Sequence, residues 1–184
     1  AISGIIPDYS NLIEFSEDWF KKAGIDLFLE TTVEKIDIKN KKVYFKNDKI
    51  VIEKQFDSLI FATGAKPSIP PIKNIIINDK LIKNVFSLRT IDDAKFISSS
   101  IEKGKNATII GAGLIGLELA ETLNKRQMNV TIVEALTQIL PNTLDLDMSK
   151  IVFDELVKKV KIFTNHIAIN VESKSDKIEK VIIK

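Results

Sequence analysis

Cysteine is absent from the 184-residue sequence. Disulfide bonds, thiolate metal sites and a cysteine nucleophile are therefore excluded from this chain. Histidine occurs once, as His166, at the end of an apolar run, where there is no second histidine to share a metal ion. A lone histidine of this kind is usually an ordinary structural or surface residue. We therefore assign no metal site and no catalytic residue.

The sequence also lacks a strong excess of either charge. Its 27 Lys and Arg residues oppose 25 Asp and Glu residues, for a net charge of +2, so composition gives no basis for a nucleic-acid partner. No apolar run approaches the ~18 residues that a membrane span needs, and no charged-then-apolar leader opens the chain. A hydrophobic content of 45% is enough for a packed core. We expect a cytoplasmic protein of one large or two small domains.

The first part of the chain predicts a short helix followed by antiparallel strands. The stretch "FSEDWFKKAG" has Ser16 as N-cap, acids in its first turn, lysines in its last turn and Gly24 as its end. Three β-rich stretches follow: "IDLFLETTVEKIDI", "KKVYFKN" and "IVIEKQF". "DSLIFATG" then runs apolar without alternation, which is typical of a strand buried on both faces. The next stretch, "AKPSIPPIKN", carries three prolines in ten residues, so it predicts an extended connector and a domain boundary.

The second part alternates between helices and strands. "TIDDAKFISSSIEKG" predicts a helix with Thr90 as N-cap, Asp93 as its capping-box partner and Gly104 as its end. "ATII", "NVTIVEA" and "KIFTN" predict strands, separated by the helical stretches "LIGLELAETLNKRQ" and "LDMSKIVFDELVKKV". This order predicts a parallel sheet with right-handed crossovers. The tail "IAINVESKSDKIEKVIIK" predicts a hairpin around a polar turn.

Three glycines in "ATIIGAGLIGLELAETL" have the spacing G-x-G-x-x-G: Gly111, Gly113 and Gly116. They follow a predicted strand and open a predicted helix, as a dinucleotide-binding loop requires. The first glycine permits a tight turn, the second allows the backbone to approach a pyrophosphate, and the third allows close packing of the helix on the strand. The helix N-terminus then offers free N–H groups to the anion. The alternative is that the glycines serve helix–strand packing alone.

An acid in the expected place favours the dinucleotide. Glu134 closes the next predicted strand, 18 positions after Gly116, where a carboxylate can accept hydrogen bonds from the adenosine ribose. No arginine follows it closely, although an arginine there would indicate a 2′-phosphate. We therefore expect NAD(H), rather than NADP(H), as the bound dinucleotide.

At this point the sequence resembles the FAD-dependent pyridine-nucleotide disulfide oxidoreductases, especially their NADH oxidase and coenzyme A disulfide reductase branch. Four stretches carry the resemblance: "SEDWFKKAGIDLFLETTVEKID", "LIFATGAKPSIPPI", "TIIGAGLIGLELAETL" and "VTIVEALTQILPNTLDLDMSKIVFDELVKK". It implies an α/β architecture, with a Rossmann-like parallel sheet that binds NAD and a partial FAD-domain segment with antiparallel strands. The implied bounds are 1–70 for the FAD-domain segment, 71–83 for a linker and 84–184 for an NAD domain that is incomplete at its C-terminus.

The resemblance also implies cofactor contacts outside the glycines. Val33 would lie near the adenine of FAD, and a short turn would lie near the flavin nucleotide: Ala62, Thr63 and Gly64. Glu118 would point toward the nicotinamide and flavin rings. Leu114 and Ile115 would line the dinucleotide loop, with Leu114 where an aromatic gate often stands. Each has an ordinary alternative, since β-branched residues fill strands, glycines end strands and acids favour early helix turns.

The sequence departs from the family in ways that shape the expected function. It shows no glycine-rich FAD fingerprint and no redox cysteine, so we expect an internal fragment with an incomplete FAD site. We also expect the parallel sheet to end one strand short, leaving an edge prone to association, for example as a homodimer. In the parent protein NADH would reduce FAD, which would pass electrons to oxygen or a disulfide. The alternatives are a ferredoxin or rubredoxin reductase of the same fold and a non-catalytic NAD(H)-binding module.

Overall fold

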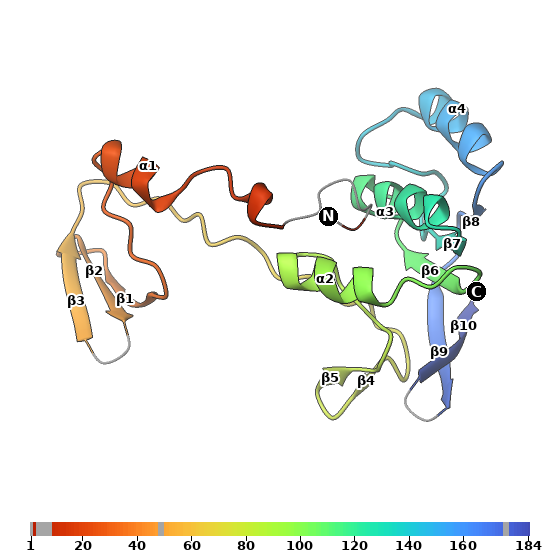
Figure 1. Ribbon diagram of the computed structural model, residues 1–184, viewed down its shortest axis with the longest axis horizontal. Coiled ribbons are helices and arrows are strands. Elements are labelled where there is room, and N and C mark those ends of the chain that lie inside the picture. The colour runs from red at the N-terminus through yellow and green to blue at the C-terminus, as the bar shows by residue number, and fades with distance from the viewer. Residues whose placement is uncertain (1, 3–8, 48–49, 175–176) are drawn as a thin grey trace. The chain divides into compact units, whose positions relative to one another are not determined.

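The computed structural model describes residues 2, 9–47, 50–174 and 177–184. The chain divides into two compact units, which are described separately (Figure 1). The small unit is Ser10–Ala65, and the large unit is Lys66–Lys184 together with Ala1–Tyr9. Helices and both parallel and antiparallel strands are present, which confirms the predicted mixed α/β class.

The small unit contains one short helix and an antiparallel sheet. The helix α1 begins after Ser16, whose hydroxyl accepts the Trp19 N–H at 3.3 Å, as the N-cap prediction requires. Phe28 packs against Phe45 on the sheet, with ring centroids 4.9 Å apart. The three strands pair in the order β1-β2-β3, which confirms the prediction. The bounds are η1 Tyr9–Leu12, α1 Glu17–Lys22, β1 Thr32–Asp37, β2 Lys42–Asn47 and β3 Ile50–Gln55.

The prediction of a buried strand in "DSLIFATG" is wrong. Residues 58–64 form no strand, and the side chains of Ile60 and Phe61 are 86% and 69% exposed. A strand needs a neighbour to bond its backbone N–H and C=O groups, and a face on which its apolar side chains can pack. No described strand pairs with this stretch. This stretch therefore forms an exposed segment without regular secondary structure.

The large unit is built on a parallel sheet of three strands in the order β6-β7-β8. Equivalent residues pair across it, as Thr108 with Thr131 and Thr131 with Lys161. The connections are the helices α3 and α4, so the predicted strand–helix–strand–helix–strand order is confirmed. The bounds are β6 Asn106–Ile110, α3 Leu114–Lys125, β7 Asn129–Val133, α4 Leu146–Leu156 and β8 Lys161–Phe163.

Helix α2, Ile91–Ser99, confirms the predicted capping box. Thr90 accepts the Asp93 N–H, and the Asp93 carboxylate accepts the Thr90 N–H. The helix ends at Ser100, however, and the prediction that Gly104 ends it is wrong. The hydroxyls of Ser99 and Ser100 both donate to the Phe96 carbonyl, at 2.8 and 2.9 Å. Serine side chains compete with the backbone ladder in this way, so they terminate the helix early.

Two hairpins complete the large unit. The predicted C-terminal hairpin is formed by β9, Ala168–Lys174, and β10, Lys177–Ile183, although part of its polar turn lies outside the described residues. Residues 71–83 contain the short strands β4, Ile76–Ile77, and β5, Lys80–Leu81. Ile72 and Ile75 join Val171 of β9 in one buried apolar cluster, so this segment packs against the C-terminal hairpin.

The main core of the large unit lies around the parallel sheet, α3 and the segment that follows β7. This core therefore fixes α3, the helix that begins at the glycine loop. Its most buried members come from β7, α3 and the loops beside them: Ala112, Leu117, Ala120, Leu123, Met128, Val130, Ile132, Ile139, Leu140 and Val160. In the part of the chain that the structure describes, no helix has the length and apolar character to cross a membrane.

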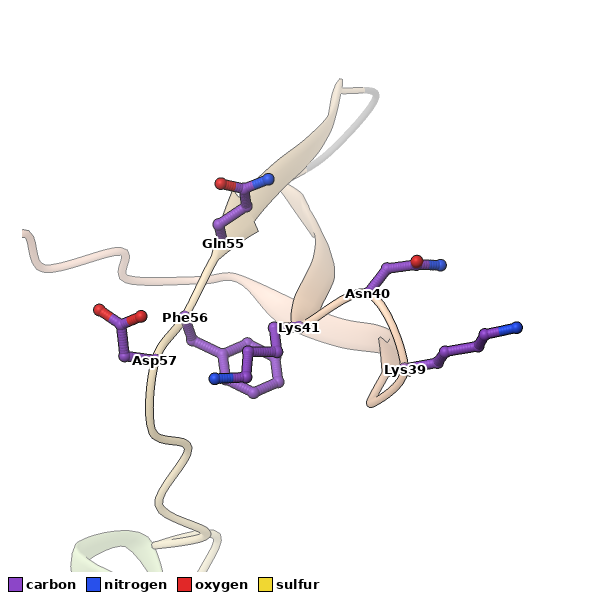
Figure 2. Close-up of a pocket in the computed structure, with 6 residues that line it drawn as sticks. All are labelled: Lys39, Asn40, Lys41, Gln55, Phe56 and Asp57. Carbon is purple, nitrogen blue, oxygen red and sulfur yellow. The ribbon is translucent and has the colours of Figure 1, made fainter.

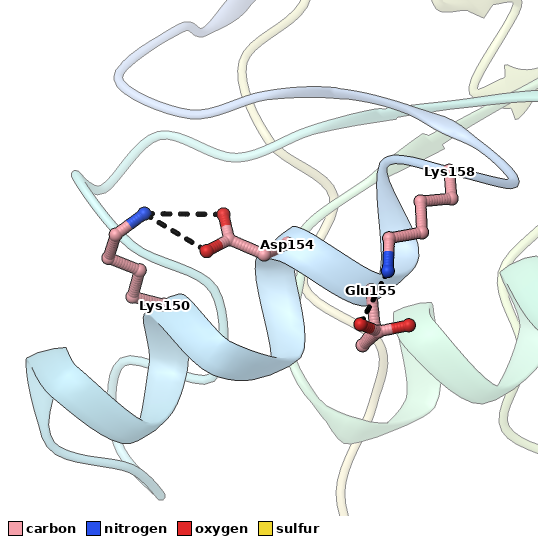
Figure 3. A network of polar contacts seen from close by, with 4 residues as sticks. All are labelled: Lys150, Asp154, Glu155 and Lys158. Atoms are coloured by element: carbon pink, nitrogen blue, oxygen red, sulfur yellow. Dashed lines mark hydrogen bonds and ion pairs between the residues drawn. The ribbon is translucent and has the colours of Figure 1, made fainter.

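The outer face of α4 is ordinary solvated surface (Figure 3). Lys150 Nζ lies 3.0 and 3.3 Å from the two Asp154 carboxylate oxygens, and Lys158 Nζ lies 2.6 Å from Glu155 Oε1. All four side chains are more than half exposed, and Lys158 lies just beyond the end of α4, so each pair contributes a few tenths of a kcal/mol at most. We assign this face no function.

Candidate functional site

The glycine loop lies at the carboxyl end of the parallel sheet, between β6 and α3. Gly111 follows β6 with φ of +101°, a conformation that side chains disfavour. Its N–H donates to the Val133 carbonyl at 2.8 Å, which extends the pairing of β6 with β7 by one residue. The chain then turns sharply into α3. The first glycine therefore has the turning role that the sequence motif predicts.

Gly116 packs so closely that no side chain fits. A Cβ built on it would lie 2.2 Å from the Gly111 carbonyl oxygen and 3.5 Å from an Ile109 side-chain carbon. The nearer atom is backbone, which cannot swing away as a flexible side chain does. The helix therefore rests directly on the end of β6, in agreement with the packing role of the third glycine.

Gly113 is the N-cap of α3 and faces open space. A Cβ built on it would meet nothing within 4 Å, and no side chain caps this helix end. The N–H groups of the first helical turn have no intrahelical acceptors, and the helix dipole adds partial positive charge at this end. Leu114 and Ile115 in that turn are 58% and 64% exposed. This end of the helix can therefore receive a phosphate group from solvent.

Glu134 lies next to the loop, immediately after β7. Its side chain is only 7% exposed. Oε2 accepts the Ala112 N–H at 2.7 Å, and Oε1 accepts the Leu136 N–H at 2.8 Å. A carboxylate has about four lone-pair sites, so two remain for further donors. The structure thus places the predicted acid beside the glycine loop, where it also holds two backbone N–H groups.

The remaining large-unit candidate, Glu118, is exposed on the second turn of α3. It is on the same helix as Leu114 and Ile115, so these three residues and the glycines share one end of α3. The neighbouring Glu121 pairs with Lys125 at 2.9 Å, and that hydrogen bond holds the pKa of Glu121 below its usual range. The ion pair with Lys125 gives Glu121 a structural role on this helix. Glu118 stays a candidate for contact with the cofactor.

The flavin candidates belong to the small unit. Val33 lies in β1 and is 53% exposed. Ala62, Thr63 and Gly64 lie in the exposed irregular segment after residue 58, with Gly64 at φ of +71°. Since all four residues are exposed, they do not by themselves enclose a ligand. The described residues of this unit therefore do not fit a complete flavin site.

A shallow recess on the small unit is a weaker candidate (Figure 2). It encloses about 390 Å³ and is lined by the β1–β2 turn and the end of β3: Lys39, Asn40, Lys41, Gln55, Phe56 and Asp57. The Lys39 side chain extends away from Phe56, so the polar groups do not converge. A ligand site needs such convergence, and we assign the recess no function.

Metal chemistry has no support in the described part of the chain, where no group of three His, Cys, Asp or Glu side chains could hold an ion. His166 has a structural environment: its Nδ1 lies 2.7 Å from the Thr164 carbonyl oxygen, and its ring packs against Phe163 at 5.5 Å.

Sequence reasoning missed the backbone partners of the glycine loop. Ala112 bonds Glu134 through its N–H, and its carbonyl accepts the Leu140 N–H at 2.9 Å. Leu140 has φ of +50° although it carries a buried side chain. A backbone hydrogen bond leaves no mark on residue type, so no motif could have indicated Leu140.

Comparison with known proteins points to one family. The sequence model described as pyridine nucleotide-disulphide oxidoreductase matches residues 6–184. An NADH oxidase from Methanocaldococcus jannaschii is 39% identical over 163 residues, which cover 86% of this chain and 35% of the relative. A CoA-dependent NAD(P)H sulfur oxidoreductase from Pyrococcus abyssi is 31% identical over 184 residues, which cover 99% of this chain and 40% of the relative.

Among solved structures, the fold is similar to that of an NAD-dependent persulfide reductase from A. fulgidus. The TM-score is 0.84 at 33% identity, over 99% of this chain and 34% of that protein. This chain therefore spans between 34% and 40% of the length of these three proteins.

Proposed function

We infer the function of this chain from one premise: it belongs to the pyridine nucleotide-disulphide oxidoreductase family. We propose that its large unit binds NAD(H) at the glycine loop. The observation that carries the proposal is the contact of Gly116 with the Gly111 carbonyl oxygen, which brings α3 down onto β6. This packing leaves the helix N-terminus uncovered at Gly113, beside a buried carboxylate.

Each part of the site has a distinct task in nucleotide binding. The pyrophosphate lies at the N-terminus of α3, where free N–H groups and the positive end of the helix dipole stabilise its charge. Gly113 permits the close approach because it has no side chain. Glu134 accepts hydrogen bonds from the adenosine ribose hydroxyls through its two remaining lone-pair sites. Leu114, Ile115 and Glu118 face the rest of the nucleotide.

The activity we propose belongs to the family as a whole. NADH supplies a hydride, FAD receives it, and the electrons pass to oxygen or a disulfide. Three observations support this: the family match, the relative called an NADH oxidase, and the two sulfur-compound reductases among the similar proteins. We propose that Val33 and residues 62–64 contribute to the FAD site of such an enzyme. The chain would then act as part of a flavin-dependent NADH oxidoreductase.

The division of the chain follows the same proposal. We propose that residues 1–70 belong to a FAD-binding domain and that residues 84–184 belong to an NAD-binding domain. The antiparallel sheet of the small unit and the parallel sheet of the large unit support a division into two parts, whereas residues 1–9 and 66–70 belong to the large unit. Residues 71–83 would connect the two domains, while packing against the C-terminal hairpin through Ile72 and Ile75.

Calorimetric titration of the 184-residue chain with NADH tests the proposal directly. We expect saturable binding at one site per chain, and competition by ADP-ribose, which carries the pyrophosphate and the adenosine without the nicotinamide. Replacing Gly113 by Val puts a branched side chain into the open space where the pyrophosphate is placed, and it should abolish binding. Equal NADH affinity in the wild-type chain and the Gly113→Val variant, or no binding in either, would contradict the proposal.

A further inference from the structure

The buried loop residue Ala112 is held by distant segments on both sides. It is 0% exposed. Its N–H donates to Glu134 Oε2 at 2.7 Å, and its carbonyl accepts the Leu140 N–H at 2.9 Å. Both polar groups of the Ala112 backbone, between the first two glycines, are therefore bonded within the protein. These two hydrogen bonds differ in what happens to them when a dinucleotide binds.

The hydrogen bond from Ala112 to Glu134 can change when a nucleotide binds. The same carboxylate is the proposed acceptor for the ribose hydroxyls, so its charge is shared with the nucleotide. The Leu140 hydrogen bond joins two backbone groups, neither of which is a proposed ligand of the nucleotide. Leu140 is therefore the group that can fix the loop independently of the nucleotide.

The backbone of Leu140 is strained. Its φ is +50°, in the left-handed region that residues with a Cβ disfavour. Pro141 follows it, and a residue before proline favours extended backbone. Both the Leu140 side chain and the proline that follows it disfavour this φ at Leu140, so the surrounding structure must impose it.

Three hydrogen bonds and the packing of the Leu140 side chain impose the conformation. The carbonyl of Ile139, a residue that is 0% exposed, accepts the buried Ser149 hydroxyl at 2.7 Å. The Leu140 carbonyl accepts the N–H groups of Thr143 and Leu144 at 2.9 and 3.0 Å. The Leu140 side chain is 8% exposed and belongs to the main core. Strain that is held this firmly, and aimed at the loop of a binding site, indicates a role in function.

We propose that Leu140 is a positioning residue for the dinucleotide: its backbone N–H fixes Ala112, so that the phosphate loop is formed before the nucleotide arrives. The inference rests on the proposed binding of NAD(H) at this loop. A pre-formed loop does not pay an ordering cost on binding, so loss of the Leu140 hydrogen bond weakens affinity without removing any group that touches the ligand.

Substitutions at Leu140 separate its N–H from its side chain. Leu140→Pro removes the N–H and cannot reach a positive φ, and we expect NADH to bind at least tenfold more weakly by calorimetry. Leu140→Gly keeps the N–H and adopts this φ without strain, and we expect an affinity within threefold of wild type. The matched control is Leu123→Ala, which removes a 5% exposed side chain from the same core away from the loop. It should lower the melting temperature and leave NADH affinity within threefold.

Wild-type affinity in Leu140→Pro, or an equal loss in Leu123→Ala, would overturn the positioning role while leaving the proposed function intact. A wild-type chain that fails to bind NADH would overturn the proposed function, and with it the role of Leu140 in nucleotide binding.

Two further measurements decide the question if Leu140→Pro does not fold. Ser149→Ala removes the hydroxyl that holds the Ile139 carbonyl, so it should weaken NADH binding about threefold to tenfold relative to Leu123→Ala. Amide hydrogen exchange of the nucleotide-free wild-type chain should show Leu140 protected to the same degree as Ile132 of the central strand. Exchange of the Leu140 amide at the rate of an open loop, or unchanged affinity in Ser149→Ala, would contradict the proposal.

Discussion

At the scale of single residues, the second and third glycines of the loop are required for different physical reasons. A side chain on Gly116 would collide with the backbone oxygen of Gly111 at 2.2 Å, whereas a side chain on Gly113 would enter open space. One glycine therefore serves the fold, and the other leaves room for a ligand. Substitution by the smallest side chain separates the two roles.

We expect Gly116→Ala to lower the free energy of unfolding by about 2 kcal/mol or more, because overpacking against backbone forces the helix to shift. Gly113→Ala should cost about 1 kcal/mol or less, which is the usual penalty for losing a glycine N-cap. It should nevertheless weaken NADH binding at least about tenfold, or 1.4 kcal/mol. Urea unfolding and calorimetry measure the two effects. Equal stability losses in the two variants would contradict the assignment.

Glu134 carries the second residue-scale prediction, a preference for NAD(H) over NADP(H). A 2′-phosphate would bring about two negative charges toward a carboxylate that is 7% exposed. We expect the chain to favour NADH by at least about 2 kcal/mol, or more than tenfold in affinity. Glu134→Ala should narrow the gap mainly by weakening NADH binding.

The same substitution should also reduce stability, because it leaves the buried N–H group of Ala112 without its acceptor, at about 1–3 kcal/mol for such a group. Titration of both nucleotides and a urea melt test these effects together. Equal or tighter binding of NADPH by the wild-type chain would show that the preference is wrong.

At the scale of elements, local signals predicted those features that depend on neighbours in the sequence. The capping box of α2 needs only Thr90 and Asp93 at the correct spacing, and both hydrogen bonds form. The end of α2 was misplaced, since Ser99 and Ser100 terminate the helix before Gly104. The predicted strand in "DSLIFATG", residues 57–64, failed for another reason: strand formation depends on a pairing partner, which a single stretch of sequence does not show.

The capping box makes the stability of α2 sensitive to acid. The Asp93 carboxylate accepts backbone N–H groups from Thr90 and Arg89, and these bonds hold the pKa of Asp93 below its usual range. A carboxylate whose pKa is lower in the folded than in the unfolded protein stabilises the fold. This stabilisation is complete when the pH is above the unfolded-state pKa, about 3.9. It is lost as the pH falls through the folded-state pKa. The stabilisation should be constant from pH 7 to pH 5 and should decline below pH 4.

Thermal melts at pH 7, 5 and 3 test this prediction. Asp93→Asn should lower the melting temperature relative to wild type at pH 7, and the difference should shrink at pH 3. The control is Asp92→Asn, which removes an equal charge from the same turn while leaving the capping box intact; Asp92 pairs only with exposed Lys95 at 3.0 Å among the described contacts. A difference for Asp93→Asn that stays constant across this pH range would contradict the prediction.

At the scale of the whole molecule, the two units differ in how their candidate cofactor residues are placed. The order of strands in the large unit and the place of Glu134 follow from periodicity and motif spacing, so the sequence predicted both. The hydrogen bond from the Leu140 N–H to the Ala112 carbonyl could not be predicted, because it depends on a backbone conformation that leucine disfavours. The flavin candidates were located only by resemblance, and the structure leaves them exposed.

This difference predicts that the 184-residue chain binds NADH and retains no flavin. In the large unit, the uncapped N-terminus of α3, the open space at Gly113 and the buried Glu134 lie together. In the small unit, Val33 and residues 62–64 are exposed, so bound FAD would gain little from burial. We expect the purified chain to be colourless after gel filtration and to oxidise no NADH, while NADH titration of the same sample gives saturable heat. A stoichiometric flavin absorbance spectrum that survives gel filtration would show that the described residues of the small unit suffice for FAD binding.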